Sequence, residues 1–178
     1  MVDWVLSAYE TDPGLPHPAL LVLGPFMAAE SQAEFQARAD RLPNVEVITF
    51  DTHIESLFDR AVGVVAMGGY NTFCEILSFD KPGLIVPRTV PRKEQYIRAS
   101  RAQDMGLVRM LVNDGVRSPR DMSTALRFLA SQPRPSAAMR PGMMDGLHTV
   151  SQLVNWLLHD QPGDARSAHG PGAERQRA

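Results

Sequence analysis

The residues best suited to chemistry stand in one short segment, Met67-Gly68-Gly69-Tyr70-Asn71-Thr72-Phe73-Cys74-Glu75. An apolar run, 62–67, ends in two glycines, and a segment compatible with a helix, 71–79, follows directly. Glycines let the backbone approach a ligand closely, and the first turn of a helix offers unpaired N–H groups at the positive end of its dipole. The pattern therefore predicts an anion site, with a phosphate-bearing ligand above the turn.

Glu75 has two interpretations that can coexist. The run Thr72-Phe73-Cys74-Glu75 fits a capping box, in which Thr72 is the N-cap and the Glu75 side chain bonds back to it. A buried glutamate in a crevice at the end of a strand could instead accept hydrogen bonds from the hydroxyls of a ribose. The sequence leaves both roles open.

Other patterns narrow the chemistry by their absence from the sequence. There is no Asp-x-Asp pair, no metal-ligand spacing among the histidines, no Gly-x-Gly-x-x-Gly fingerprint and no P-loop. The single cysteine, Cys74, excludes a disulfide within the chain and is expected to be a small buried residue, not a nucleophile. We therefore expect no metal ion and no cofactor other than a bound substrate.

Composition indicates an ordinary globular domain. Apolar residues make up 44% of the 178 residues, and 18 basic residues stand against 20 acidic ones, so no global charge favours nucleic acid. No apolar run approaches the ~20 residues of a membrane span, and the first residues lack a signal-peptide pattern. We expect a cytoplasmic protein.

Strands and helices are predicted to alternate along the chain. Apolar runs predict strands at 19–23, 45–48, 62–67, 84–86 and 107–111, and helices are expected at 2–9, 28–42, 54–60, 71–79, 93–105, 119–131 and 147–159. This order is typical of an α/β domain with a doubly wound parallel sheet. We expect an N-terminal helix and linker at 1–18, the domain at 19–159 and a disordered tail at 160–178.

A family resemblance rests on the central turn and on residues that follow it. The segment 69–75, then Pro87, then Glu94-Gln95-Tyr96 with Ala99 resemble the C-terminal, donor-binding domain of GT-B glycosyltransferases of family 28. The resemblance covers roughly 19–111. It implies a Rossmann-like sheet of about five to six strands. The chain departs from the family pattern at Gly24-Pro25-Phe26, where the family has Gly-Gly-Ser.

The resemblance also implies roles for individual residues. Glu75 would bind the ribose hydroxyls of a nucleotide sugar, and Glu94 and Gln95 would contact the hydroxyls of its sugar. Phe50 and Asp51 would lie beside the base. The remaining implied donor-binding residues are the turn residues Gly68, Gly69, Tyr70, Asn71 and Thr72, which would face the diphosphate, and Gly24 in the family's first glycine-rich turn.

The function implied is inverting transfer of a hexosyl group from a UDP-GlcNAc-like donor to a hydroxyl acceptor. The partner would be an N-terminal acceptor-binding half or a separate subunit, because a GT-B enzyme has two Rossmann-like halves and this chain has one. Any association with a membrane surface would arise through that half, and the catalytic base would lie there too. Two alternatives stay open: a non-catalytic nucleotide-sugar-binding subunit and a GT-B-type sugar epimerase.

Overall fold

The computed structural model describes residues 1–51, 53–113 and 115–159. It divides into two compact units, Met1–Met139 and Arg140–Ala178, and each is described here by itself. The predicted tail at 160–178 lies outside the described residues.

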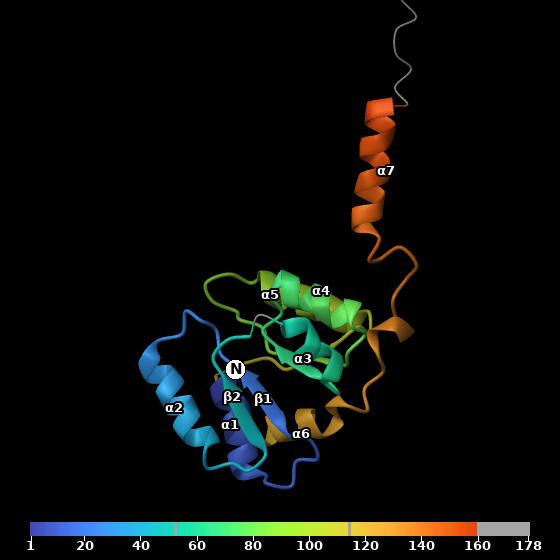
Figure 1. Cartoon of the computed structure of the whole chain (residues 1–178). Helices are drawn as coiled ribbons and strands as arrows, with labels where there is room; N and C mark the ends of the chain where they lie inside the picture. Colours follow the sequence, from blue (N-terminus) through green and yellow to red (C-terminus); the bar gives the residue numbers. More distant parts are fainter. Residues whose placement is uncertain (52, 114, 160–178) are drawn as a thin grey trace, which may run out of the picture. The chain divides into compact units, whose positions relative to one another are not determined.

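Helices and strands alternate through the first unit (Figure 1). In chain order they are α1 (Val2–Thr11), β1 (Ala19–Val22), α2 (Ala29–Ala39), β2 (Val45–Ile48), α3 (Ile54–Arg60), β3 (Val64–Ala66), α4 (Tyr70–Ser78), β4 (Gly83–Ile85), α5 (Glu94–Asp104), β5 (Arg109–Met110), α6 (Pro119–Leu129) and a short 3-10 turn (Pro135–Ala137). A helix or strand stands wherever the sequence predicts one, and the α/β fold class is confirmed.

The strands form two parallel sheets. One has the order β1-β2, and the other has the order β3-β4-β5. Leu21 of β1 lies opposite Val47 of β2, and Val65 of β3 lies opposite Leu84 of β4. The single sheet that we expected is therefore divided between β1 and β3.

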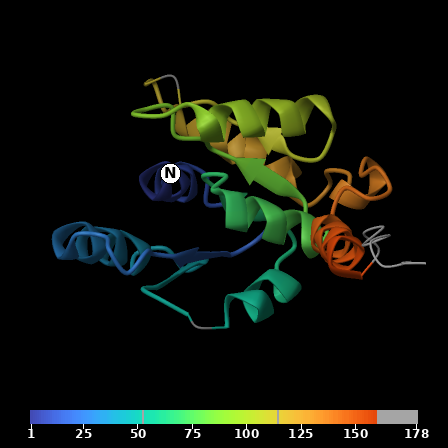
Figure 2. The ribbon, with the colours of Figure 1, turned by 90° about the horizontal axis from the view of Figure 1, so that it is seen from above.

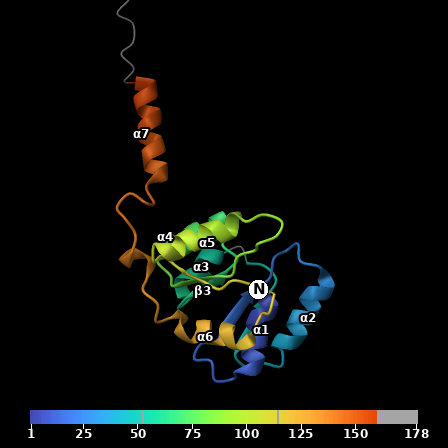
Figure 3. The same ribbon diagram turned by 180° about the vertical axis from the view of Figure 1, so that it is seen from behind.

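Helices cover both faces of these strands, and each face has its own core. Around α1 and α6, one apolar cluster includes Leu6, Met122, Leu21 of β1 and Leu84 of β4, so the two sheets share this core. The other cluster joins α3, α4 and α5 to β3 and β4 and includes the fully buried Ile76. Figure 2 shows α4 between α3 and α5, and Figure 3 shows α6 beside α1.

Helix α1 is an integral part of this unit, although we expected residues 1–18 to lie outside the domain. The side chains of Trp4, Leu6 and Tyr9 are buried in the core beside α6. Two hydrogen bonds fix the helix ends: Trp4 Nε1 donates to the Ser118 carbonyl at 2.7 Å, and the Tyr9 hydroxyl donates to the His17 carbonyl at 2.7 Å. A short apolar helix has the same sequence pattern whether it precedes a domain or completes its core.

The second unit contributes α7 (Gly146–His159) to the described residues. Its apolar residues recur at helical spacing, as the sequence predicts: Leu147, Val150, Leu153, Val154, Leu157 and Leu158. Among the described residues of the whole chain, none of the helices combines the length and the apolar character needed to cross a membrane.

An ion-pair network between α1 and α2 predicts that the stability of the fold decreases in acid. Arg38 of α2 donates to Glu10 at 2.7 and 2.8 Å and to Asp3 at 2.7 Å. The hydrogen bond from Arg38 lowers the pKa of each carboxyl below its ordinary value, 3.8 for Asp3 and 4.5 for Glu10. A carboxyl group whose pKa is lowered by folding stabilises the folded state at any pH above its pKa in the unfolded chain. This contribution is lost as the pH falls through its lower pKa in the folded protein.

The measurement is the thermal unfolding midpoint of the wild type and of Arg38→Met between about pH 7 and about pH 3. We expect the wild type to be more stable at neutral pH and the difference to shrink in acid. Arg101→Met is the control, because Arg101 is exposed on α5. A difference that stays constant over the whole range would contradict a role for these two carboxylates.

Candidate functional site

The turn between β3 and α4 requires glycine at its first position. Gly68 has a φ of +77°, in the left-handed region, and a Cβ atom there would lie 2.7 Å from Cγ2 of Ile85. Around Gly69 a Cβ would meet nothing within 4 Å, so the backbone at this position is open to a ligand. The sequence expectation of a close backbone approach at this turn is consistent with this geometry.

The capping-box interpretation of Thr72 and Glu75 is wrong. Gly69 is the N-cap of α4, no side chain caps the helix, and Thr72 is already the third helical residue. The two glycines allow the backbone to enter the helix earlier than the box pattern requires. Glu75 consequently lies in the second turn, where it cannot reach back to an N-cap.

The first turn of α4 keeps its backbone N–H groups available. The first hydrogen bond of the helix runs from the Phe73 N–H to the Gly69 carbonyl at 2.9 Å. The N–H groups of Tyr70, Asn71 and Thr72 therefore have no partner within the helix. Since no acidic residue stands in this first turn, the positive end of the helix dipole is not neutralised locally.

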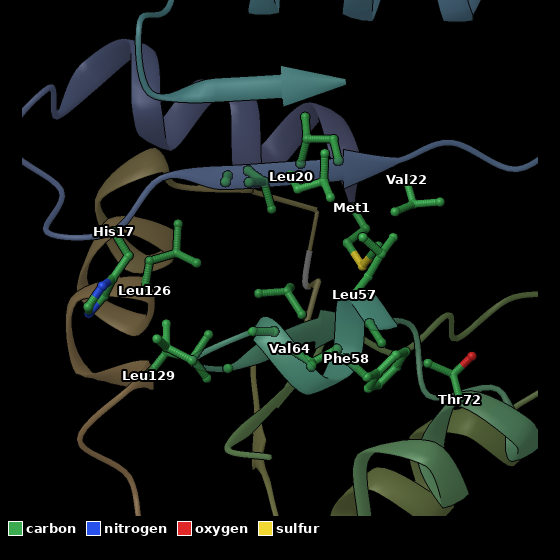
Figure 4. A pocket seen from close by; sticks show the side chains of 18 of the residues that line it. Met1, His17, Leu20, Val22, Leu57, Phe58, Val64, Thr72, Leu126 and Leu129 are labelled. Atoms are coloured by element: carbon green, nitrogen blue, oxygen red, sulfur yellow. The ribbon is translucent and has the colours of Figure 1, made fainter. Parts of the chain in front are cut away.

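A cavity of about 630 Å³ lies between β1 and β3 and reaches this turn at one end (Figure 4). The predicted site residues that line it are Gly68, Gly69, Thr72, Glu75 and Gln95. Glu75 is half-buried, and among the described residues its carboxylate makes no hydrogen bond and no ion pair. A carboxylate on a residue that lines a cavity, with its acceptors free, can bind a ligand that carries hydroxyl groups.

Arg98 is a residue of this site that sequence reasoning missed. Its Nη1 donates to the Gly68 carbonyl at 2.7 Å, and its guanidinium carbon lies 5.6 Å from the centre of the Tyr70 ring. The side chain thus spans from α5 to the turn and brings a positive charge to the start of α4. Its position could have indicated it, because Arg98 stands one helical turn after Gln95 on the same face of α5.

Glu94 and Gln95, the two α5 residues that we predicted for the site, differ in their surroundings. Gln95 lines the cavity, and its Oε1 accepts a hydrogen bond from the Arg88 backbone N–H at 3.0 Å, which fixes its side chain after β4. Glu94 is the first residue of α5, and its side chain is exposed. The structure therefore brings Gln95, but not Glu94, to the cavity wall.

The remaining predicted residues lie apart from this cavity wall. Gly24 follows β1 in an exposed turn closed by a hydrogen bond from the Met27 N–H to its carbonyl at 3.0 Å. Phe50 follows β2 and is 62% exposed. The Asp51 carboxylate accepts a hydrogen bond from the His53 N–H at 2.7 Å, at the start of α3.

Comparison with known proteins gives one family and a shared fold. The family model of the glycosyltransferase family 28 C-terminal domain matches residues 20–149. No curated protein matches the chain. Among solved structures, glycosyltransferase VinC in complex with DTDP is 25% identical, with a TM-score of 0.61 over 86% of this chain and 36% of that chain.

Two further structures show the same fold. The glycotransferase of kitacinnamycin is 22% identical, with a TM-score of 0.64 over 91% of this chain and 40% of that chain. The spinosyn forosaminyltransferase SpnP is 19% identical, with a TM-score of 0.58 over 86% of this chain and 38% of that chain. The chain thus spans less than half the length of each of these three proteins.

Proposed function

Because this chain belongs to the glycosyltransferase family 28 C-terminal domain family, we propose that it binds the nucleotide-diphosphate sugar of a glycosyl transfer reaction. The observation that supports this most strongly is the open first turn of α4, which begins directly after Gly68 and borders a cavity. Helix N-termini of this kind bind phosphate groups through free N–H groups and the helix dipole.

The proposed contacts follow from the positions of the side chains. The N–H groups of 70–72 bind the diphosphate, and Arg98 adds a positive charge beside them. The free carboxylate of Glu75 accepts hydrogen bonds from the ribose hydroxyls, and Gln95 contacts the donor sugar. Three further contacts are proposed as secondary ones. Glu94 contacts the donor sugar, Phe50 and Asp51 lie beside the base, and Gly24 lies near the phosphates.

The proposed reaction is inverting transfer of a hexosyl group. An acceptor hydroxyl oxygen attacks C1 of the sugar, the bond from C1 to the phosphate oxygen breaks, and the nucleoside diphosphate leaves with the electron pair. Negative charge grows on that diphosphate in the transition state. Fixed N–H groups stabilise such charge, and the removal of one such donor costs on the order of 3 kcal/mol in comparable sites.

A second half of the protein completes the proposed enzyme. The matched glycosyltransferases are more than twice as long as this chain, which leaves room in them for an acceptor-binding half. We propose that residues 1–178 bind the donor and transfer nothing alone. We propose a UDP-GlcNAc-like donor, and the DTDP named for VinC makes dTDP the second probe.

Calorimetric titration of the chain with UDP, dTDP, UDP-GlcNAc and uridine tests the proposal. We expect the diphosphates to bind at least about tenfold more tightly than uridine, because charge-assisted hydrogen bonds to the phosphates supply 1.4 kcal/mol or more. Equal binding of uridine and UDP would contradict a phosphate site at the turn. Turnover of UDP-GlcNAc with added acceptors by the chain alone would contradict the need for a second half.

Arg98→Ala is expected to weaken UDP binding by about tenfold or more, because hydrogen bonds to charged groups contribute about 1.5–3 kcal/mol. The substitution removes the bond to Gly68 and the positive charge beside the phosphates. The matched control is Arg101→Ala, which removes an exposed arginine from the same helix. Calorimetry in which both variants bind UDP equally well would remove Arg98 from the site.

Donor binding is expected to be independent of divalent ions. The sequence holds no Asp-x-Asp pair, and Arg98 with the N–H groups of α4 supplies positive charge at the proposed phosphate position. The measurement is UDP affinity in EDTA and after addition of magnesium or manganese. We expect less than about a threefold change, and a large loss in EDTA that metal restores would contradict this account.

A further inference from the structure

The two sheets present open edges to each other. The Ala19 N–H donates to the Asn44 carbonyl at 2.9 Å, and the Leu23 N–H donates to the Ile48 carbonyl at 2.8 Å. Both of these bonds run from β1 toward β2. Because parallel strands pair through alternate residues, the backbone groups of Leu20 and Val22 face away from β2. Among the described residues β1 has no second partner strand.

The facing edge belongs to β3. The Val64 N–H donates to the Pro82 carbonyl at 2.9 Å, and the Ala66 carbonyl accepts from the Val86 N–H at 2.8 Å. Both bonds run toward β4, so the backbone groups of Val65 face the other way, toward β1. In the described part of the chain β4 is the one strand that pairs with β3.

The cavity described above lies between these two edges. Its lining includes 18–22 on one side, 62–67 on the other, and side chains of α1 and α6. Figure 4 shows Leu20 and Val22 of β1 on one wall and Val64 on the opposite wall. Leu20 is 42% and Val22 39% exposed, which is unusual for apolar side chains on a strand that has parallel partners in a doubly wound fold.

Both strands run in the same direction along the cavity. His17, before β1, lies at the same end as Leu129 of α6 in Figure 4, and a Cβ on Gly63, before β3, would lie 2.6 Å from Leu129. Val22, at the end of β1, lies toward the opposite end, as does Thr72 after β3. A parallel strand placed between them would meet hydrogen-bond partners on both sides.

The order of the strands shows which position is open. Doubly wound sheets commonly have the order 3-2-1-4-5-6. Here the order is β2-β1, then the cavity, then β3-β4-β5, and both sheets contribute to the core beneath α1 and α6. The cavity therefore occupies the place of the first strand of that order, at the centre of the sheet.

We propose that this cavity is the site of one further parallel β-strand, supplied by polypeptide outside residues 1–178 and joined by a short turn to α1. Met1 lines the cavity near Val22, at the end where such a strand would finish. The connection from strand to α1 to β1 is then the right-handed crossover that parallel strands require. The strand is apolar and rich in Val and Ile, because it is covered on both faces.

A small-molecule site is the competing interpretation of this cavity. Ligand pockets present a few polar side chains that converge on one point. This cavity instead presents two rows of backbone N–H and C=O groups along its length. Its polar side chains do not converge: Thr72, Glu75 and Gln95 belong to the α4 end, and His17 lies at the opposite end. Its long apolar part has the hydrogen-bonding pattern of a strand neighbour.

An added strand also changes the expected role of Gly24 in the proposed donor site. The turn that follows the added strand lies next to Gly68 and Gly69, at the switch point of the sheet. Gly24 follows β1, one strand farther away. The first glycine-rich turn of the donor site is then the one that joins the added strand to α1.

A fusion tests the proposal on the full chain. A run of about five Val and Ile residues and a Gly-Ser turn is placed before Met1, and the control carries the same extension with prolines at alternate strand positions. Amide hydrogen exchange is measured at Leu20, Val22 and Val65. We expect exchange at these amides to slow by at least about tenfold in the fusion and to stay fast in the proline control.

Two outcomes would overturn the proposal. Equal exchange at Leu20, Val22 and Val65 in the fusion and its proline control would mean that no strand enters the cavity. Strong protection of these amides in the unextended chain, equal to that of Leu23, would mean that β1 and β3 pair with each other in solution. The second measurement needs no extension and stays decisive if the fusion does not fold.

Discussion

Glu75→Gln is expected to weaken the binding of UDP-GlcNAc or UDP by about ten- to a hundredfold, the loss of one or two hydrogen bonds to a charged group. Glu75 lines the cavity, and its carboxylate has no hydrogen-bond or ion-pair partner among the described residues, so its acceptors are available to a ribose. The amide of glutamine keeps the volume but replaces one acceptor oxygen by a donor. Calorimetry measures the loss directly.

Two controls separate this effect from a general change in the protein. Glu34→Gln removes a carboxylate from an exposed position on α2 and should leave UDP affinity unchanged. Thr72→Ser keeps the hydroxyl in the first turn of α4 and should change affinity far less than Glu75→Gln. If Glu75→Gln binds UDP as the wild type does, the ribose assignment is wrong.

Leu6→Ala is expected to lower the free energy of unfolding by about 3 kcal/mol, because replacement of a buried leucine by alanine costs about 2–5 kcal/mol. Leu6 is 0% exposed and lies in the core between α1, α2 and α6. The substitution removes apolar contacts and leaves a cavity that the surrounding helices fill only in part. Urea unfolding followed by circular dichroism gives the change.

Ile97→Ala is the matched control, because Ile97 also lies in a helix but is 57% exposed. Its expected cost is within about 0.5 kcal/mol, apart from a small difference in helix propensity. A loss of stability at Leu6 as small as that at Ile97 would mean that α1 is not part of the cooperative unit. It would support the domain start at residue 19 that we first expected.

Local sequence patterns predicted the local structure well. Apolar runs bounded by Gly, Pro and Asn fall on the strands, and the glycine pair followed by a helical segment falls on the turn before α4. These features depend on residues close together in the chain, where backbone sterics and periodicity decide the outcome. The error at Thr72 is one of helix start, which glycines permit at more than one position.

Features that depend on distant residues could not be predicted in this way. The pairing of β1 with β2 but not with β3 is a contact between strands that no local pattern specifies. Arg98 reaches the Gly68 carbonyl from 30 residues away along the chain. The burial of Leu6 depends on α6, more than a hundred residues later in the sequence.

The most direct test of the central claim is the map of UDP binding by backbone amide NMR shifts on the 178-residue chain. The account predicts that UDP shifts the amides of Gly69, Tyr70, Asn71 and Thr72 most strongly, and that uridine alone leaves them largely unchanged. These are the N–H groups of the first turn of α4, which have no hydrogen-bond partner within the helix. Saturating UDP that leaves these four amides unmoved would contradict a diphosphate site at this turn.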